Sequence, residues 1–228
     1  MLFVAEIGLN HDGNYDLAYE LIRQAKLSGA DIAKFQFGWR NRPDEINHID
    51  LGRAQQLKQW CDELGIDMLA SLIIEEALDL GRAIGLHSYK IASRTVRDDP
   101  ALCERILSEG KETFVSLGMW EGKDFPFGPP TDTLRYIYCV SKYPTYPRDL
   151  SLLERFGSDT FYGYSDHCHG ITACLLAVAR GAQYIEKHFT LNKTSQVIRD
   201  HVLSSTPDEF RQLVDLGREM HVYLEKAS

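Results

Sequence analysis

Two histidines in related sequence settings are the residues best suited to chemistry in this chain. His167 ends the segment Ser-Asp-His, and His188 lies within Glu-Lys-His-Phe-Thr. Each follows a short apolar run, and a helix-patterned stretch separates the two runs. If the runs are neighbouring parallel strands, the imidazoles emerge side by side, about 5 Å apart. That separation suits two ligands of one divalent metal, so we predict a metal site at His167 and His188.

Two lysines with apolar neighbours indicate that an anion is also bound. Lys34 lies between Ala33 and Phe35, and Lys90 lies next to Tyr89. A lysine in such a run is costly to bury unless an anion or a carboxylate meets it. The other polar residues at predicted strand ends are Glu6, Asn10, His11, Gln36, Ser71, Ser93, Ser116, Ser141, Tyr143 and Ser165. Together these residues predict a phosphate- or carboxylate-binding site.

The elements that must position these residues alternate between short apolar runs and amphipathic stretches. We predict strands at residues 2–7, 31–36, 67–71, 87–92, 112–117, 134–140, 160–164 and 183–188. Helical apolar spacing is found at 15–28, 51–64 and 208–224, whereas 120–132 is rich in Gly and Pro and predicts a loop or a single turn. Eight such units predict the α/β class and a (β/α)8 TIM barrel as a single domain over residues 1–228, with the chemistry at the C-terminal ends of the strands.

Composition limits the partners of the chain. A formal net charge of −8 argues against nucleic acid and anionic membranes as partners. No apolar run approaches the roughly 18 residues of a membrane span, and the first residues do not resemble a secretory leader.

The five cysteines are an odd number and form no Cys-x-x-Cys pair. We therefore expect a cytoplasmic location with reduced thiols. Cys168, beside His167, is an alternative third metal ligand, although a packed thiol is the simpler reading.

Several motifs resemble the sialic acid synthase family. They lie at residues 5–13, 33–36, 89–93, 116–119, 139–144, 163–167 and 185–191. The motifs occur in order over nearly the whole chain. The resemblance implies condensation of phosphoenolpyruvate with an N-acetylated sugar aldehyde, forming a nonulosonic acid such as a sialic acid and releasing phosphate.

The resemblance also implies roles for individual residues. Glu6, Lys34 and Lys90 are the catalytic candidates, and His167 and His188 resemble the ligands of Mn²⁺, with Mg²⁺ or Co²⁺ as alternatives. The substrate-binding candidates are Gln36, Ser71, Ser93, Ser141, Tyr143, Ser165 and Asp200. In the implied mechanism the metal polarises the aldehyde, C3 of phosphoenolpyruvate attacks it, water adds at C2 and phosphate leaves. Lys34 and Lys90 would neutralise the anionic groups, and Glu6 would manage a proton.

The chain departs from the family pattern at several positions. Ser71 and Ser141, which resemble phosphoenolpyruvate contacts, stand where members usually have Thr and Asn. Arg94-Thr95 replaces the usual Gly-Glu, which alters the sugar half of the site. We hypothesise that Arg94 pairs with a phosphate or carboxylate of the acceptor. The segment at 38–50 is shorter than usual, and the sequence ends at Ser228, where members usually continue into an antifreeze-like domain. A homodimer and a separate antifreeze-like domain protein are therefore the expected protein partners.

Two other readings stay open. One is a Schiff-base aldolase that uses Lys90 or Lys34, because barrel aldolases carry such a lysine at a strand end. The other is a barrel of the same family that binds phosphoenolpyruvate and metal but is non-catalytic or depends on a partner.

Overall fold

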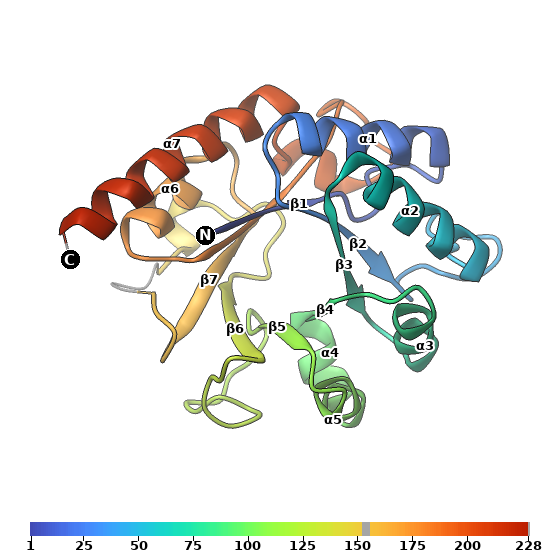
Figure 1. The fold of residues 1–228 in the computed structure, drawn as a ribbon, viewed down its shortest axis with the longest axis horizontal. Helices are drawn as coiled ribbons and strands as arrows, with labels where there is room; N and C mark the ends of the chain where they lie inside the picture. The colour runs from blue at the N-terminus through green and yellow to red at the C-terminus, as the bar shows by residue number, and fades with distance from the viewer. Residues whose placement is uncertain (152–155, 228) are drawn as a thin grey trace.

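Eight parallel strands close into a barrel at the centre of the molecule (Figure 1). The computed structural model describes residues 1–151 and 156–227. Neighbouring strands in the barrel are consecutive in the chain, and β8 closes the ring against β1. The strands are β1 (Leu2–Glu6), β2 (Ile32–Phe37), β3 (Asp67–Leu72), β4 (Ser88–Ile91), β5 (Glu112–Ser116), β6 (Leu134–Cys139), β7 (Phe161–Asp166) and β8 (Tyr184–His188). The predicted barrel is confirmed, and each strand lies within two residues of its predicted bounds.

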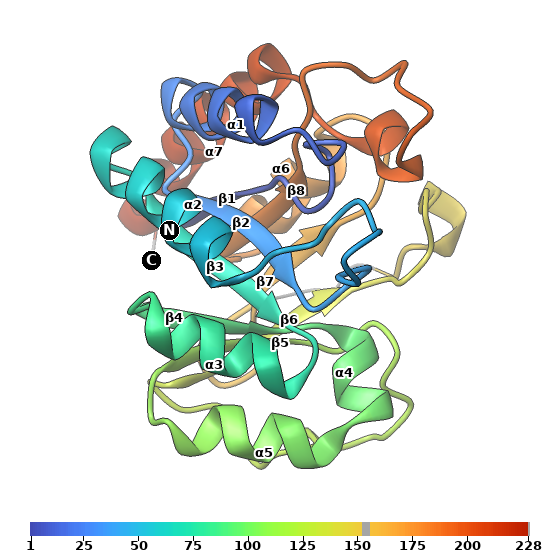
Figure 2. The same cartoon turned by 90° about the vertical axis from the view of Figure 1, so that its right-hand side faces the viewer.

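Helices cover the outside of the barrel and connect most of the strands (Figures 1 and 2). They are α1 (Tyr15–Leu27), α2 (Leu51–Leu64), α3 (Glu75–Ala83), α4 (Ser93–Asp98), α5 (Pro100–Ser108), α6 (Thr172–Ala179) and α7 (Pro207–Ala227), with short 3-10 turns η1 (Pro147–Asp149) and η2 (Arg199–Leu203). The prediction of a helix-poor fifth unit is also confirmed, since residues 117–133, all of them described, contain no helix.

Local sequence explains where the helices begin and end. The Asn14 side chain accepts bonds from the backbone of Asp16 and Leu17 and caps the start of α1. Thr206 and Glu209 form reciprocal side-chain-to-backbone bonds at the start of α7, which is a capping box. Gly65 ends α2 in the left-handed conformation that glycine adopts most easily.

The barrel interior changes from apolar to polar along several strands. Val4 is followed on the inner face by Glu6, Leu69 by Ser71 and Phe114 by Ser116, because alternate residues of a strand face the same side. A small apolar cluster fills the interior on the N-terminal side of these polar residues. It contains Val4, Ile32, Leu69, Phe114, Ile137 and Tyr184. The outward residues form the large core beneath the helices. The polar inner residues therefore collect at the C-terminal ends of the strands, where the loops after β1, β2 and β8 also gather (Figure 2).

Two further expectations concern the whole chain. All five cysteines are buried and free. Of the helices that the structure describes, none combines the length and the apolar character of a membrane span.

The fold predicts a strong effect of a single methyl group at Gly163 in β7. A Cβ atom there would lie 2.1 Å from the backbone oxygen of Tyr184 in β8, so the two strands would have to separate. We expect Gly163→Ala to lower the free energy of unfolding by about 3 kcal/mol in a urea titration. Gly52→Ala is the matched control, because a Cβ at this helical glycine would make only an ordinary contact of 3.5 Å with Asp50 Oδ1, and its replacement should raise stability by about 0.5–1 kcal/mol. Equal effects of the two substitutions would contradict the close approach of β7 and β8.

Candidate functional site

A cavity of about 310 Å³ opens at the C-terminal end of the barrel. It is lined by the twelve residues to which the family resemblance assigned a role: Glu6, Lys34, Gln36, Ser71, Lys90, Ser93, Ser141, Tyr143, Ser165, His167, His188 and Asp200. Their roles stay predictions, but their convergence is a property of the fold, because parallel strands end at the same side of the barrel.

The floor of the cavity is a buried charge network around two lysines. Lys34 donates to Glu6 at 2.6 Å and to Ser71 at 3.2 Å, and Lys90 donates to Ser116 at 2.6 Å. Both ammonium groups also face Glu186, at 3.6 and 3.5 Å. Each buried cation therefore meets a carboxylate, which offsets the free-energy cost of removing it from water.

Glu186 is the central residue that the sequence analysis missed. It accepts hydrogen bonds from Ser165 at 2.8 Å and from the Tyr184 hydroxyl, so its two oxygens are fixed in place. The strand period could have revealed it, because Glu186 lies two residues before His188 in β8 and must share its inward face. The contact itself joins β8 to β2 and β4 across the barrel and has no local signal.

The network shifts the pKa values of the two lysines in opposite directions. Burial lowers the pKa of Lys34, but the carboxylates of Glu186 and Glu6 outweigh it and raise that pKa above the ordinary value. Burial also lowers the pKa of Lys90, and here Glu186 only partly opposes it while the charge of Lys34 adds to it. Burial raises the pKa of Glu186, yet the two lysines overcome this and keep the carboxylate ionised. Lys34 is therefore a fixed cation and Lys90 is the more easily deprotonated amine.

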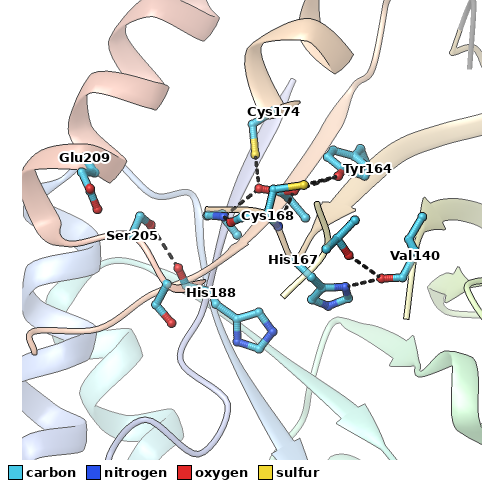
Figure 3. A network of polar contacts seen from close by, with 12 residues as sticks. Val140, Tyr164, His167, Cys168, Cys174, His188, Ser205 and Glu209 are labelled. Atoms are coloured by element: carbon cyan, nitrogen blue, oxygen red, sulfur yellow. Dashed lines mark hydrogen bonds and ion pairs between the residues drawn. The ribbon is translucent and has the colours of Figure 1, made fainter. Parts of the chain in front are cut away.

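His167 and His188 lie side by side, as predicted. Their ring centroids are 5.4 Å apart, and the Tyr143 ring packs 4.1 Å from the His167 ring. Nδ1 of His167 donates to the Val140 carbonyl at 2.8 Å, which leaves the Nε2 lone pair free (Figure 3). Burial, with the neighbouring His188, lowers the pKa of His167 to about 4. His167 is therefore a neutral imidazole at neutral pH.

The two imidazoles fit a divalent metal as a pair of protein ligands. Nδ1 of His188 is buried and has no hydrogen-bond partner, so a bound group there would satisfy it. Across residues 1–151 and 156–227 no group of three or more His, Cys, Asp or Glu is arranged to hold a metal. A cation at this pair would therefore take its other ligands from substrate or water.

Three candidates from the sequence do not reach the cavity. His11 bonds to Asn47 at 3.1 Å, and Asn10 donates to the Phe189 carbonyl at 2.9 Å. Cys168 lies beside Tyr164 and Asp166 and is not part of the cavity lining. The alternative that Cys168 is a third metal ligand is therefore not supported.

A second buried ion pair lies directly behind the histidines. Asp166 and Lys187 precede His167 and His188 in the chain, so their side chains face the opposite side of the sheet. Lys187 donates to Asp166 at 2.7 Å, and both side chains are 0% exposed. The register pairs these two residues across β7 and β8. The ion pair thus holds together the two strand ends that carry the histidines.

Further hydrogen bonds complete this rear network (Figure 3). Asp166 accepts from the Tyr164 hydroxyl at 2.7 Å, from the Cys168 backbone at 3.0 Å and from Cys174 Sγ at 3.5 Å. Lys187 also donates to the Cys168 carbonyl. Burial raises the pKa of Asp166, but Lys187 and these donors outweigh it, so the pKa lies below its ordinary value.

Comparisons with known proteins show that this chain resembles sugar-acid synthases. A model described as the NeuB family matches residues 44–228. An N,N′-diacetyllegionaminic acid synthase of Legionella pneumophila is 30% identical over 97% of this chain and 72% of its own length. Human N-acetylneuraminate-9-phosphate synthase is 30% identical over 92% of this chain and 67% of its own length. A structure of an N-acetylneuraminic acid synthetase from Leptospira borgpetersenii superposes with a TM-score of 0.81 at 27% identity, covering 98% of this chain and 84% of that one.

The rear ion pair predicts a large loss of stability in Lys187→Met. The substitution leaves Asp166 buried without its cation, so we expect the free energy of unfolding at neutral pH to fall by about 3–5 kcal/mol in a urea titration. Without Lys187 the pKa of Asp166 in the folded state rises above its unfolded value. The loss should therefore shrink as the pH falls toward about 5, because the native state then binds the extra proton.

Lys58→Met is the matched control for this prediction. Lys58 forms an ion pair of 2.6 Å with the exposed Asp62 on α2, and its loss should cost less than about 1 kcal/mol. A similar cost for both substitutions would contradict the assigned importance of the rear pair.

Proposed function

The chain belongs to the NeuB family, and on that premise we propose that it condenses phosphoenolpyruvate with an N-acetylated sugar aldehyde. The product would be a sialic-acid-like nonulosonic acid, with release of phosphate. Relatives named as legionaminic, pseudaminic and N-acetylneuraminate-9-phosphate synthases support this reaction class. The observation that carries the proposal is one cavity in which two buried lysines lie beside a pair of histidines.

The floor of the cavity supplies the charges that phosphoenolpyruvate needs. Lys34 and Lys90 would bind its phosphate and carboxylate, and the hydroxyls of Ser71, Ser93 and Ser165 line the same region. Glu186 positions both ammonium groups, because it faces each of them and is itself held by Ser165 and Tyr184. Such a preformed arrangement holds the enol in a pose for attack at low entropic cost.

The acceptor half is built by residues around Glu6. The Glu6 carboxylate accepts hydrogen bonds from Lys34 and Gln36, both at 2.6 Å, and these bonds hold it in the cavity lining. C3 of phosphoenolpyruvate would form the new bond to the aldehyde carbon, and the aldehyde oxygen would take a proton. Water would add at C2, and cleavage of the C2–O bond would release phosphate. Glu6 is the side chain that would move a proton on the acceptor or on the water.

His167 and His188 would hold the divalent cation, with Mn²⁺ proposed and Mg²⁺ or Co²⁺ as alternatives. Bound there, the cation would supply Lewis-acid polarisation of the acceptor carbonyl. The neutral state of His167 and its fixed tautomer prepare the ring for that task. The cytoplasmic location, the homodimer and the separate antifreeze-like domain protein stay predictions.

The lowered pKa of Lys90 favours one second candidate, a Schiff-base aldolase. Borohydride would then trap pyruvate on Lys90, and EDTA would not prevent it. A non-catalytic or partner-dependent barrel would instead bind phosphoenolpyruvate without releasing phosphate from it.

The metal prediction is tested by phosphate release from phosphoenolpyruvate with a panel of N-acetylated sugars. We expect release only with an acceptor and a divalent cation, and complete loss in EDTA. His167→Ala and His188→Ala each remove one of two protein ligands and should lower kcat/KM by roughly 100-fold or more. His87→Ala, an exposed histidine outside the cavity, is the control and should match the unchanged chain. Release that persists in EDTA would count against the proposed reaction.

The role of Glu186 is tested by the pH profile of Glu186→Gln. Glu186 opposes the fall in the pKa of Lys90 that burial causes, so its neutralisation should lower that pKa further. We expect the alkaline limb of kcat/KM for phosphoenolpyruvate to move to lower pH by about one unit, since Lys90 then loses its proton earlier. Glu112→Gln, at the opposite end of the barrel, should leave the limb in place. An unmoved limb in Glu186→Gln would show that Glu186 does not control Lys90.

A further inference from the structure

Two arginines stack on aromatic rings at the mouth of the cavity. Arg94, in the first turn of α4, lies 4.8 Å from the centre of the Trp39 ring. Arg199, at the start of η2, lies 4.6 Å from the centre of the Tyr143 ring. Both arginines line the cavity and are exposed to solvent. The family pattern drew attention to Arg94 but not to Arg199, because the short 3-10 turn η2 has no apolar repeat that predicts it.

The two arginines approach the mouth from different sides. Trp39 follows β2 and Arg94 follows β4, whereas Tyr143 follows β6 and Arg199 follows β8. In the closed order of strands these pairs occupy opposite parts of the ring. A group that enters the cavity therefore passes between two guanidinium groups.

The rim arginines differ from the buried lysines in their charge balance. Lys34 and Lys90 each face a carboxylate inside the barrel. Arg94 forms no ion pair among the residues that the structure describes, and Arg199 contacts only the adjacent carboxylate of Asp200, at 3.4 Å. The positive charge that remains for a second anion is thus at the rim and not on the floor.

Stacking on an aromatic ring orients a guanidinium group so that it can bind an oxyanion. The ring covers one face of the guanidinium and limits its motion, while the N–H edge remains available for paired bonds to oxygen. Phosphate and carboxylate groups match that edge. In a protein of net charge −8 an anion is attracted only where cations concentrate, and the mouth is such a place.

We propose that Arg94 and Arg199 form an anion subsite that selects acceptor sugars with a phosphate or carboxylate at the end remote from the aldehyde. This inference rests on the proposed function, because it assumes that the acceptor enters above the two lysines. The aldehyde would lie near His167 and His188, and the anionic end would remain at the rim.

The test compares three forms of one N-acetylated aldohexose: the neutral sugar, its 6-phosphate and its 6-carboxylate. The readout is kcat/KM for phosphate release from phosphoenolpyruvate by the full chain with Mn²⁺. We expect an anionic form to be preferred, and we expect Arg94→Gln and Arg199→Gln each to reduce that preference by about 10-fold or more. Comparison of the phosphate and carboxylate forms identifies the natural oxyanion. Arg94→Lys and Arg199→Lys should restore part of the preference, because they keep the charge but lose the fork.

Arg148→Gln is the matched control. Arg148 stacks on Tyr146 at 5.1 Å in the same manner but does not line the cavity, so the preference should change by less than about two-fold. The subsite is overturned if the neutral sugar is preferred, or if either rim variant leaves the preference unchanged.

Calorimetric binding of the 6-phosphate separates this inference from the proposed reaction. If no acceptor supports phosphate release, the proposed reaction fails. Binding of the 6-phosphate that is lost in Arg94→Gln and Arg199→Gln but kept in Arg148→Gln would still support the subsite. Binding that is absent, or that does not depend on the two arginines, would overturn it.

Discussion

The ionic contact that Glu186 shares with Lys34 and Lys90 determines what the barrel can hold. These three groups are buried with Glu6 at the C-terminal end of the interior, where each isolated charge would cost several kcal/mol. Glu186 faces both ammonium groups and Glu6 faces Lys34, so each cation has a carboxylate partner that offsets this cost. Because Ser165 and Tyr184 hold Glu186 in turn, the network is preformed before any substrate enters. An electrostatic site built in this way needs little reorganisation during a reaction.

Strands β7 and β8 use both of their faces for function. Glu186 and His188 face inward toward the cavity, whereas Asp166 and Lys187 face outward toward α6. The outward ion pair is fully buried and ties the two strand ends together, which keeps His167 and His188 side by side (Figure 3). Because residues of a strand alternate in direction, the inward residues can bind ligands while the outward ion pair holds them in position.

The charged groups of the cavity differ in type and burial between its floor and its rim. The floor contains buried lysines that face Glu6 and Glu186, and the rim contains exposed arginines on aromatic rings. Among the departures from the family pattern, Ser71 lies on the floor beside Lys34, and Arg94 lies at the rim. The rim is the part that can change most easily, because loops vary more than the strand ends that they connect.

The sequence by itself determined the eight strands and the barrel, because hydrophobic alternation and parallel strand ends are local patterns with one geometric outcome. The roles of the twelve site residues came instead from the family resemblance, since a residue such as Asp200 lies in η2 beyond any strand. Only the tertiary structure decided which charges pair, since the contacts of Glu186 cross the barrel between residues distant in the chain. It also decided that His11 does not line the cavity, because its ring bonds to Asn47, which is 36 residues away in the chain. The position of Arg199 over Tyr143 could not be predicted either, because the short 3-10 turn η2 has no repeat that predicts its direction.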